Sequence, residues 1–274
     1  MKLQKNKPYT ILRKNNALIL FTLLYLICSL SYTSCSFKKS FLKHKTKRCN
    51  VDNSLLNPEE KRDIIQLHNK LRNQIATQRT TIGPKLPYAT NMVQMYYSEA
   101  LGAKAQEWAD NCTFSHSDEN DRKQPQFSVG ENMYRTKNIS GYPSKNWQEA
   151  IEAWFSEAQY FGGKSVSQYN DWENTKHFTQ MIWATSYFLG CGFSAYVEGP
   201  GSLTFLYVCH YGPKGNLPGM SVYNASLTPA CLCPGNLSCN NLTYTGLCCP
   251  SGHCNHNMLE YTGEPFPGTT TPEL

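Results

Sequence analysis

Apolar residues recur at helical spacing in three stretches of the chain, and this pattern predicts three amphipathic helices. The first begins at Asn57, which can cap it, with Pro58 at the first helical position and Glu60 placed to complete a capping box. The second covers about 92–112 and the third about 145–160. Each helix should bury one face, formed by Ile64, Leu67, Leu71 and Ile75 in the first, by Leu101, Ala105, Trp108 and Cys112 in the second, and by Trp147, Ile151, Trp154 and Ala158 in the third.

Two strands are expected near the end of the middle third, at 188–197 and 202–211. The sequence Glu-Gly-Pro-Gly at 198–201 is a turn signal, so these strands should form a hairpin. Residues 113–126 are polar and predict a loop. Helices that interleave with strands and end in a hairpin fit an α+β fold, arranged as a three-layer α-β-α sandwich.

The N-terminal apolar run at 17–30 follows a basic leader, which is typical of a secretory signal peptide within 1–34. The run is short for a membrane span, which needs roughly 20 apolar residues, although an uncleaved signal anchor is the alternative. A basic stretch at 43–48 resembles a dibasic processing site, so 35–48 is predicted to be a propeptide and the mature chain to begin near Cys49. The alternative is a solvated basic linker. No stable membrane span is expected.

Charge and cysteine content favour a secreted, extracellular protein. The net charge of +6 is misleading, because the eleven Lys and Arg of residues 1–49 leave 15 basic and 20 acidic residues in the remainder. This acidic body gives no indication of a nucleic-acid partner. Twelve cysteines indicate an oxidising compartment. Glycosylation is predicted at four sequons, whereas a fifth, at Asn111, should be the least used because it adjoins Cys112; the four are Asn138, Asn224, Asn236 and Asn241.

Two short motifs resemble the signatures of the CAP superfamily, which includes cysteine-rich secretory proteins, venom allergens and pathogenesis-related proteins. They are His177-Phe178-Thr179-Gln180-Met181-Ile182-Trp183-Ala184-Thr185-Ser186 and Leu206-Tyr207-Val208-Cys209-His210-Tyr211-Gly212-Pro213-Lys214-Gly215-Asn216-Leu217. The resemblance implies the sandwich fold, a helix at about 176–184 and a short strand at 130–134. It covers about 57–217, the expected CAP domain.

The C-terminal part has a different composition, since six of the cysteines lie between Cys231 and Cys254. The sequence Cys-Leu-Cys-Pro at 231–234 resembles the hinge that follows the CAP domain in cysteine-rich secretory proteins. We therefore expect a small disulfide-rich, hinge-like extension at 228–256 and a flexible tail at 257–274. So small a segment must depend on cross-links, because it cannot bury a useful core.

The resemblance implies a central cavity lined by two histidines and two glutamates, and motif by motif these are His116, Glu131, Glu157 and His177. Glu149 and Glu152 lie close to Glu157, so the choice of Glu157 depends on the family pattern. Two neutral imidazoles could bind a divalent cation such as zinc, with His116 and His177 as its ligands, while the carboxylates orient the rings. No cofactor is expected to be obligatory.

The family also implies a disulfide between Cys191 and Cys209. Cys112 departs from the pattern, because the partner expected in the closest cysteine-rich members would follow the second motif's tyrosine, where this chain has Gly212. Cys49 or a hinge cysteine are the candidates for its partner. His210 is interpreted as structural.

The leading hypothesis is a secreted binding protein that is not an enzyme and has no catalytic residues. Recurring ligands of the family are small lipids such as sterols and fatty acids, and cell-surface or host proteins are the other expected partners. The alternatives are a metal-assisted hydrolase, such as a protease, and a venom or saliva effector. A hydrolase would also need a nucleophile, and no Ser or Cys lies in a motif that marks one.

Overall fold

The computed structural model describes residues 55–138, 145–170, 173–197, 203–240 and 242–254. The predicted signal peptide, propeptide, hairpin turn and tail lie outside these residues, as do Asn241 and the side chain of Asn138. Among the helices of the described residues, none has both the length and the apolar composition needed to cross a membrane.

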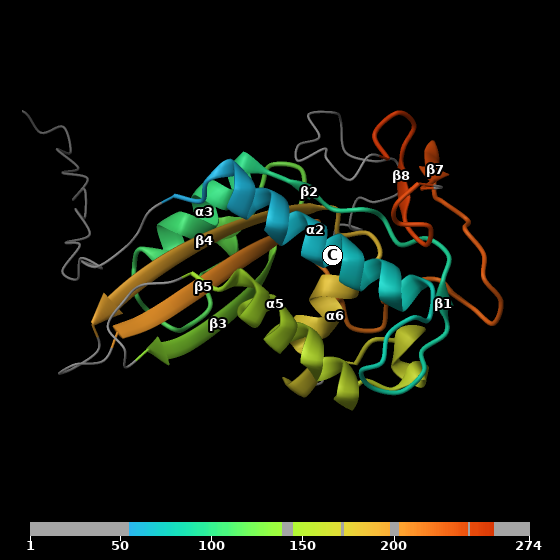
Figure 1. Ribbon diagram of the computed structural model, residues 1–274, viewed down its shortest axis with the longest axis horizontal. Helices are drawn as coiled ribbons and strands as arrows, with labels where there is room; N and C mark the ends of the chain where they lie inside the picture. The colour runs from blue at the N-terminus through green and yellow to red at the C-terminus, as the bar shows by residue number, and fades with distance from the viewer. Residues whose placement is uncertain (1–54, 139–144, 171–172, 198–202, 241, 255–274) are drawn as a thin grey trace, which may run out of the picture. The chain divides into compact units, whose positions relative to one another are not determined.

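A four-stranded sheet forms the middle of the fold (Figure 1). Its strands are β2 (Tyr96–Tyr97), β3 (Gly130–Asn138), β4 (Phe188–Val197) and β5 (Leu203–Gly212), in the order β2-β4-β5-β3. The pairs β4–β5 and β3–β5 are antiparallel, and β2 pairs with β4 in parallel. The predicted hairpin strands are confirmed, while β3 extends four residues beyond the predicted strand at 130–134.

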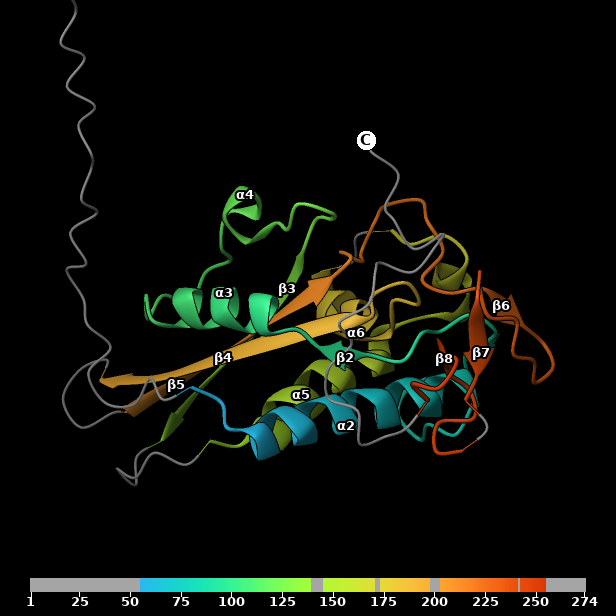
Figure 2. The same cartoon turned by 90° about the horizontal axis from the view of Figure 1, so that it is seen from above.

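Helices cover both faces of this sheet, which confirms the three-layer α-β-α sandwich (Figure 2). One layer holds α2 (Pro58–Ala76), α5 (Trp147–Ser156) and α6 (Lys176–Ile182), and the opposite layer holds α3 (Glu99–Ala109). The capping box predicted for α2 is present, with Asn57 accepting from the backbone of Glu60 and Glu60 accepting from the backbone of Asn57. A 3₁₀ turn, η1 (Glu157–Tyr160), continues α5, and the 3₁₀ turns η2 (Gly163–Val166) and η3 (Glu173–Thr175) precede α6.

The second predicted helix needs correction. Residues 92–97 are extended and contain β2, and the helix begins only after Ser98, whose hydroxyl accepts from Leu101 N at 3.3 Å. Trp108 is half-buried rather than fully buried: it packs against the core beside α3, and its indole N–H donates to Ser115 O. The predicted loop at 113–126 contains the short helix α4 (Glu119–Arg122), capped by Asp118.

Two cores lie on the two faces of the sheet. The larger core packs the apolar faces of α2, α5 and α6 against β4 and β5, and includes Phe178, Ile182 and Trp183. The smaller core lies between α3 and the sheet. There α3 approaches β4 so closely that a Cβ on Gly190 would lie 2.1 Å from Gly102 N, which requires glycine at that position. Burying one large apolar side chain stabilises the fold by about 1.5–3 kcal/mol.

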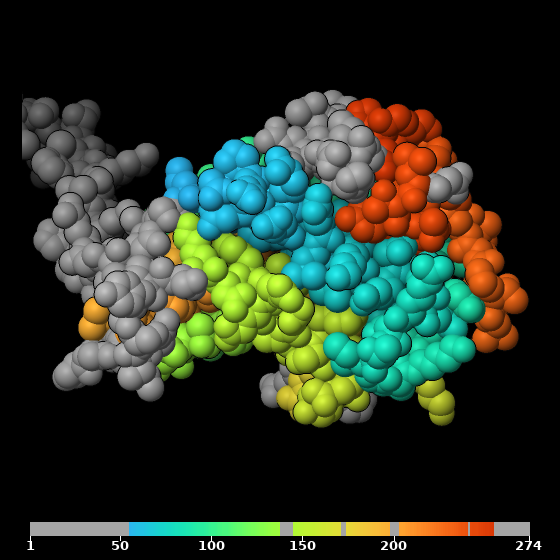
Figure 3. All heavy atoms as spheres, viewed as in Figure 1, coloured from blue at the N-terminus to red at the C-terminus, as the bar shows by residue number. Residues whose placement is uncertain are grey.

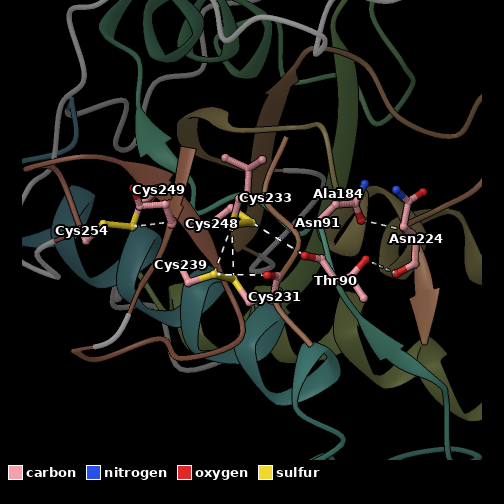
Figure 4. Close-up of a disulfide and its surroundings, with 12 residues drawn as sticks. Thr90, Asn91, Ala184, Asn224, Cys231, Cys233, Cys239, Cys248, Cys249 and Cys254 are labelled. Carbon is pink, nitrogen blue, oxygen red and sulfur yellow. Dashed lines mark hydrogen bonds between the residues drawn. A yellow bond between two sulfur atoms is a disulfide. The ribbon is translucent and has the colours of Figure 1, made fainter. Parts of the chain in front are cut away.

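The C-terminal segment docks on the sandwich. Its strands β7 (Leu237–Cys239) and β8 (Cys248–Pro250) pair with each other, and the backbone of Cys248 bonds to Met92 O and Gln94 N, both at 2.8 Å. A separate pair, β1 (Tyr88–Ala89) with β6 (Ala225–Ser226), lies beside it. Three disulfides cross-link the segment, as seen in Figure 4, and they join Cys231 to Cys239, Cys233 to Cys248 and Cys249 to Cys254.

The sandwich itself also contains disulfide-bonded cysteines. A disulfide joins Cys191 on β4 to Cys209 on β5, which are direct cross-strand partners. Cys112 is also disulfide-bonded. All six hinge cysteines are paired with one another, so the hinge candidates for the partner of Cys112 were wrong, and its partner lies outside the described residues.

Candidate functional site

His177, the first residue of the first signature motif, is held by Glu157. His177 Nδ1 lies 2.7 Å from Glu157 Oε1, and the backbone N–H groups of His177 and Phe178 donate to Glu157 Oε2 at 2.9 and 3.1 Å. Glu157 stands at the junction of α5 and η1, where the change from α to 3₁₀ winding places it beside the start of α6. Both carboxylate oxygens of Glu157 are therefore occupied, by the ring and backbone of His177 and by the backbone of Phe178.

His116 is held in the same way by Glu131, at the start of β3. The distance from His116 Nδ1 to Glu131 Oε1 is 2.8 Å, and Ser117 donates its backbone N–H to Oε1 at 2.9 Å and its hydroxyl to Oε2 at 2.7 Å. The Glu131 side chain is fully buried, whereas that of His116 is 61% exposed. Glu131 is thus an internal support and His116 faces solvent.

A third histidine, His210, contacts the same carboxylate and was missed as part of the site by the sequence analysis. Its Nε2 lies 3.0 Å from Glu131 Oε2, because Glu131 and His210 are direct partners in the β3–β5 register. The His210 side chain is 1% exposed, and its Nδ1 has no hydrogen-bond partner among the described residues. In the sequence, the only indication of this role was that the polar residue His210 lies within the second motif.

These contacts set the protonation of the site. Burial alone would raise the pKa of Glu131, but hydrogen bonds from His116, His210 and Ser117 outweigh it and hold that pKa well below its usual range. Burial is also the main cause that lowers the pKa of His210, so this ring is neutral near pH 7. An ionised carboxylate can only accept, so Nδ1 of His116 and of His177 must carry the proton. In each neutral ring, Nε2 then has the lone pair.

A buried chain of hydrogen bonds supports His177 from behind. Asn132 Nδ2 donates to His177 O at 3.0 Å and to the Tyr211 hydroxyl at 3.3 Å, and the same hydroxyl lies 3.0 Å from His68 Nε2. His68 Nδ1 in turn lies 2.8 Å from Ile64 O. Because that carbonyl can only accept, His68 carries its proton on Nδ1 and Tyr211 donates to Nε2. The chain connects α2 to the backbone of His177.

His116 and His177 line one cavity of about 600 Å³. Glu131 also lines it, and Glu157 lies directly behind His177. The structure therefore brings the four predicted residues together as two His–Glu pairs, one at 2.8 Å and the other at 2.7 Å. The other lining residues are mainly basic or carry amides, and they are Arg122, Gly130, Asn132, Lys176, Gln180, Lys214, Gly215, Asn216 and Pro218.

The donor set suits an open cation site with few protein ligands. Both glutamates are engaged with their histidines, so the imidazole Nε2 atoms are the groups suited to bind a metal. In the described residues, one group of three possible metal ligands lies close together. It consists of Cys231, Cys233 and Cys239, whose sulfur atoms all lie within 4.8 Å of one another. Their sulfurs are in disulfides, with Cys231 Sγ 3.3 Å from Cys233 Sγ (Figure 4), so they offer no thiolates.

Comparison with known proteins identifies relatives across most of the chain. The family model described as "CAP: Cysteine-rich secretory protein family" matches residues 65–211. Venom allergen 5 of Tityus serrulatus is 35% identical over 215 residues, which cover 78% of this chain and 51% of that protein. Cysteine-rich secretory protein 2 of Cavia porcellus is 37% identical over 185 residues, covering 65% and 66%. The chain spans about half the length of the venom relatives that it matches.

Solved structures with sequences similar to this chain also have a similar fold. The crystal structure described as NaASP2 with Zn2+ has a TM-score of 0.55 and 26% identity, covering 65% of this chain and 92% of that one. The crystal structure of Na-ASP-1 has a TM-score of 0.56 and 28% identity, covering 72% and 49%. The first of these was determined with zinc, one of the metals that imidazole nitrogens bind.

Proposed function

Because this chain belongs to the CAP family of cysteine-rich secretory proteins, we propose that it is a secreted binding protein whose cavity takes a divalent cation such as zinc. The observation that carries the proposal is the paired arrangement of His116 with Glu131 and of His177 with Glu157 on one cavity. Each carboxylate fixes the proton on Nδ1 and thereby presents Nε2 as a ligand. Two protein ligands leave coordination positions open, so the affinity should be modest.

Zinc titration by calorimetry tests this proposal. The metal-free protein should bind one zinc per chain, and replacing both His116 and His177 with Ala should weaken binding at least tenfold without unfolding the protein. Binding should also weaken in acid, because a protonated imidazole has no lone pair. His253→Ala, in the hinge-like segment and outside the cavity lining, is the matched control. Full zinc affinity in the double variant would refute the site.

The same contacts support a binding role rather than a hydrolytic one. A general base needs a carboxylate or imidazole that can reach a water molecule, and here only the imidazole Nε2 atoms of His116 and His177 could supply it. Glu131 is fully buried and accepts hydrogen bonds at both oxygens, and both oxygens of Glu157 are also occupied. Ser117 is buried and does not line the cavity, and the described lining holds no Ser, Thr or Cys that could act as a nucleophile. We therefore propose that the protein is not an enzyme.

A second ligand class, small lipids, is supported by a groove between α2 and α5. Figure 3 shows these helices side by side on one face of the molecule. The groove has a volume of about 860 Å³, and its lining includes the apolar residues Leu67, Trp147 and Ile151, together with basic residues (Lys70, Arg79, Lys145) and acidic ones (Glu60, Asp63, Glu152). Lys145 is paired with Glu60 at 3.2 Å, so Lys70 and Arg79 are the cations better placed for a ligand. An apolar floor with a basic residue at its rim fits a fatty acid, whose chain is apolar and whose carboxylate is charged.

Displacement of a fluorescent fatty acid tests the groove. Leu67→Arg places a charge on its floor and should weaken binding at least tenfold, while Leu232→Arg is the control, since Leu232 is 69% exposed and lies outside the groove. Equal binding by both variants would exclude this groove.

Cell-surface or host proteins remain the other proposed partners. Secretion is tested separately, because expression in a secretory host should yield soluble protein that carries glycans.

A further inference from the structure

The cavity that His116 and His177 line also contains positively charged side chains, which a site for a cation alone would not need. Arg122, Lys176 and Lys214 all line it. The carboxylate in its described lining is that of Glu131, which is fully buried and held by four hydrogen bonds. A divalent cation alone would add two positive charges to this lining. We infer that the cavity binds a phosphate group on Arg122 and Lys214.

Arg122 is fixed in place before any ligand arrives. Its Nε donates to Val129 O at 2.8 Å, and its Nη1 donates to the backbone oxygen of Ser117 and, at 3.2 Å, to the Ser117 hydroxyl. Within the described residues no hydrogen bond involves Nη2, so its two N–H groups remain available for oxygen atoms. A planar guanidinium that is already ordered loses little entropy when it binds an oxyanion.

Lys214 is the adjustable charge at this cavity. Its Nζ lies 2.8 Å from Glu119 Oε1 on α4, and both side chains are partly exposed, at 29% and 46%. Glu119 does not line the cavity, so it competes with a ligand for Lys214 from outside. An ammonium has three donors, and a phosphate could therefore share Lys214 with Glu119 or displace it.

The chemistry favours a phosphate over a carboxylate. A phosphate carries about −1.5 to −2 charges near neutral pH and has three acceptor oxygens, which matches several cations arranged around one space. A volume of about 600 Å³ also leaves room for the rest of a phosphate monoester. The inference depends on the basic lining and not on metal binding, so it can fail separately from the proposed zinc site.

Calorimetric titration of chelator-treated, metal-free protein with inorganic phosphate at low ionic strength tests the inference. Lys214→Gln should raise the dissociation constant at least fivefold. Glu119→Gln should lower it two- to fivefold, because the competing carboxylate is gone. Lys123→Gln is the matched control, since it removes a neighbouring charge that does not line the cavity, and it should change the constant less than twofold.

Further ligands identify the source of the phosphate group. Phenyl phosphate binding at least as tightly as inorganic phosphate would support a phosphorylated molecule as the ligand, and weaker binding would support free phosphate. Acetate should bind at least tenfold more weakly than either. No saturable phosphate binding, or equal weakening by Lys123→Gln and Lys214→Gln, would overturn the inference. Loss of zinc binding with phosphate binding intact would instead refute only the proposed cation site.

Discussion

Glu131 on β3 and His210 on β5 are cross-strand partners whose side chains meet at 3.0 Å between Oε2 and Nε2. Both side chains are buried, and His116 contacts the other oxygen of the same carboxylate. The orientation of the solvent-facing His116 therefore depends on a histidine in the interior of the sheet. His210 is a positioning residue, since it reaches the cavity only through Glu131.

Replacing His210 with Leu should weaken the site and the fold together. The change removes one donor from a buried carboxylate, which should cost about 1–3 kcal/mol of unfolding free energy. Loss of a group that supports a metal ligand typically reduces metal affinity about 10–100-fold. His210→Gln keeps an N–H donor and should restore zinc affinity to within about threefold. Zinc calorimetry and urea unfolding measure both effects, and unchanged zinc affinity in the Leu variant would contradict the role.

Arg72 on α2 should be among the residues most sensitive to conservative replacement. It is fully buried, and its guanidinium donates to the backbone oxygens of Val93, Met181, Trp183 and Ala184 at 2.6–3.2 Å. Lysine cannot reproduce this planar set of donors. Arg72→Lys should lower the unfolding free energy by about 3 kcal/mol, because several buried carbonyls lose their partner.

The matched control for this change is Arg62→Lys on the exposed side of the same helix. It should alter the unfolding free energy by less than about 0.5 kcal/mol. Urea midpoints measured at one pH compare the two variants. Equal midpoints would mean that the carbonyls find other partners when Arg72 is replaced.

Local chemistry made several elements predictable from the sequence. The cap at Asn57 depends on residues within one turn, and the hairpin at 188–211 depends on two apolar runs and the turn signal between them. β2 was missed because it is only two residues long and pairs in parallel with Phe188 and Leu189, far away in the sequence. The predicted helix was extended back through 92–97 on its local apolar pattern, and a local pattern cannot reveal a strand partner so far away in the sequence.

The candidate site was accessible only through the family resemblance. His116 and His177 lie far apart in the sequence, and no spacing rule connects them. The role of His210 could not be derived, because every residue of β5 is buried and no polar alternation marks an inward face. The basic lining was equally hidden, since Arg122, Lys176 and Lys214 come from three separate segments.

A peptide map of the intact protein should place Cys112 in a disulfide with Cys49. Cys112 is bonded, and the other eight described cysteines pair among themselves, so the partner is one of Cys28, Cys35 and Cys49. The first two precede the predicted processing site, and Cys49 follows it. Non-reducing digestion and mass spectrometry should recover this pair beside Cys191–Cys209. A free Cys112 in this map would refute the assignment.

Acid should destabilise the protein through His68, which lies fully buried on α2. Burial lowers the pKa of His68 from 6.5 to about 4. The folded chain therefore keeps this ring neutral at a pH where the unfolded chain already binds a proton. The resulting stabilisation is complete above about pH 6.5 and is lost as the pH falls towards 4, with a total on the order of 3 kcal/mol.

Urea unfolding at pH 7, 6 and 5 measures this loss in the wild type and in His68→Gln. The variant has no imidazole to protonate at this position, so its unfolding free energy should fall less steeply over the same range. His210, whose pKa burial also lowers, adds a loss of the same sign that both proteins share. The difference between the two slopes therefore isolates His68, and parallel slopes would show that protonation of another group governs the acid sensitivity.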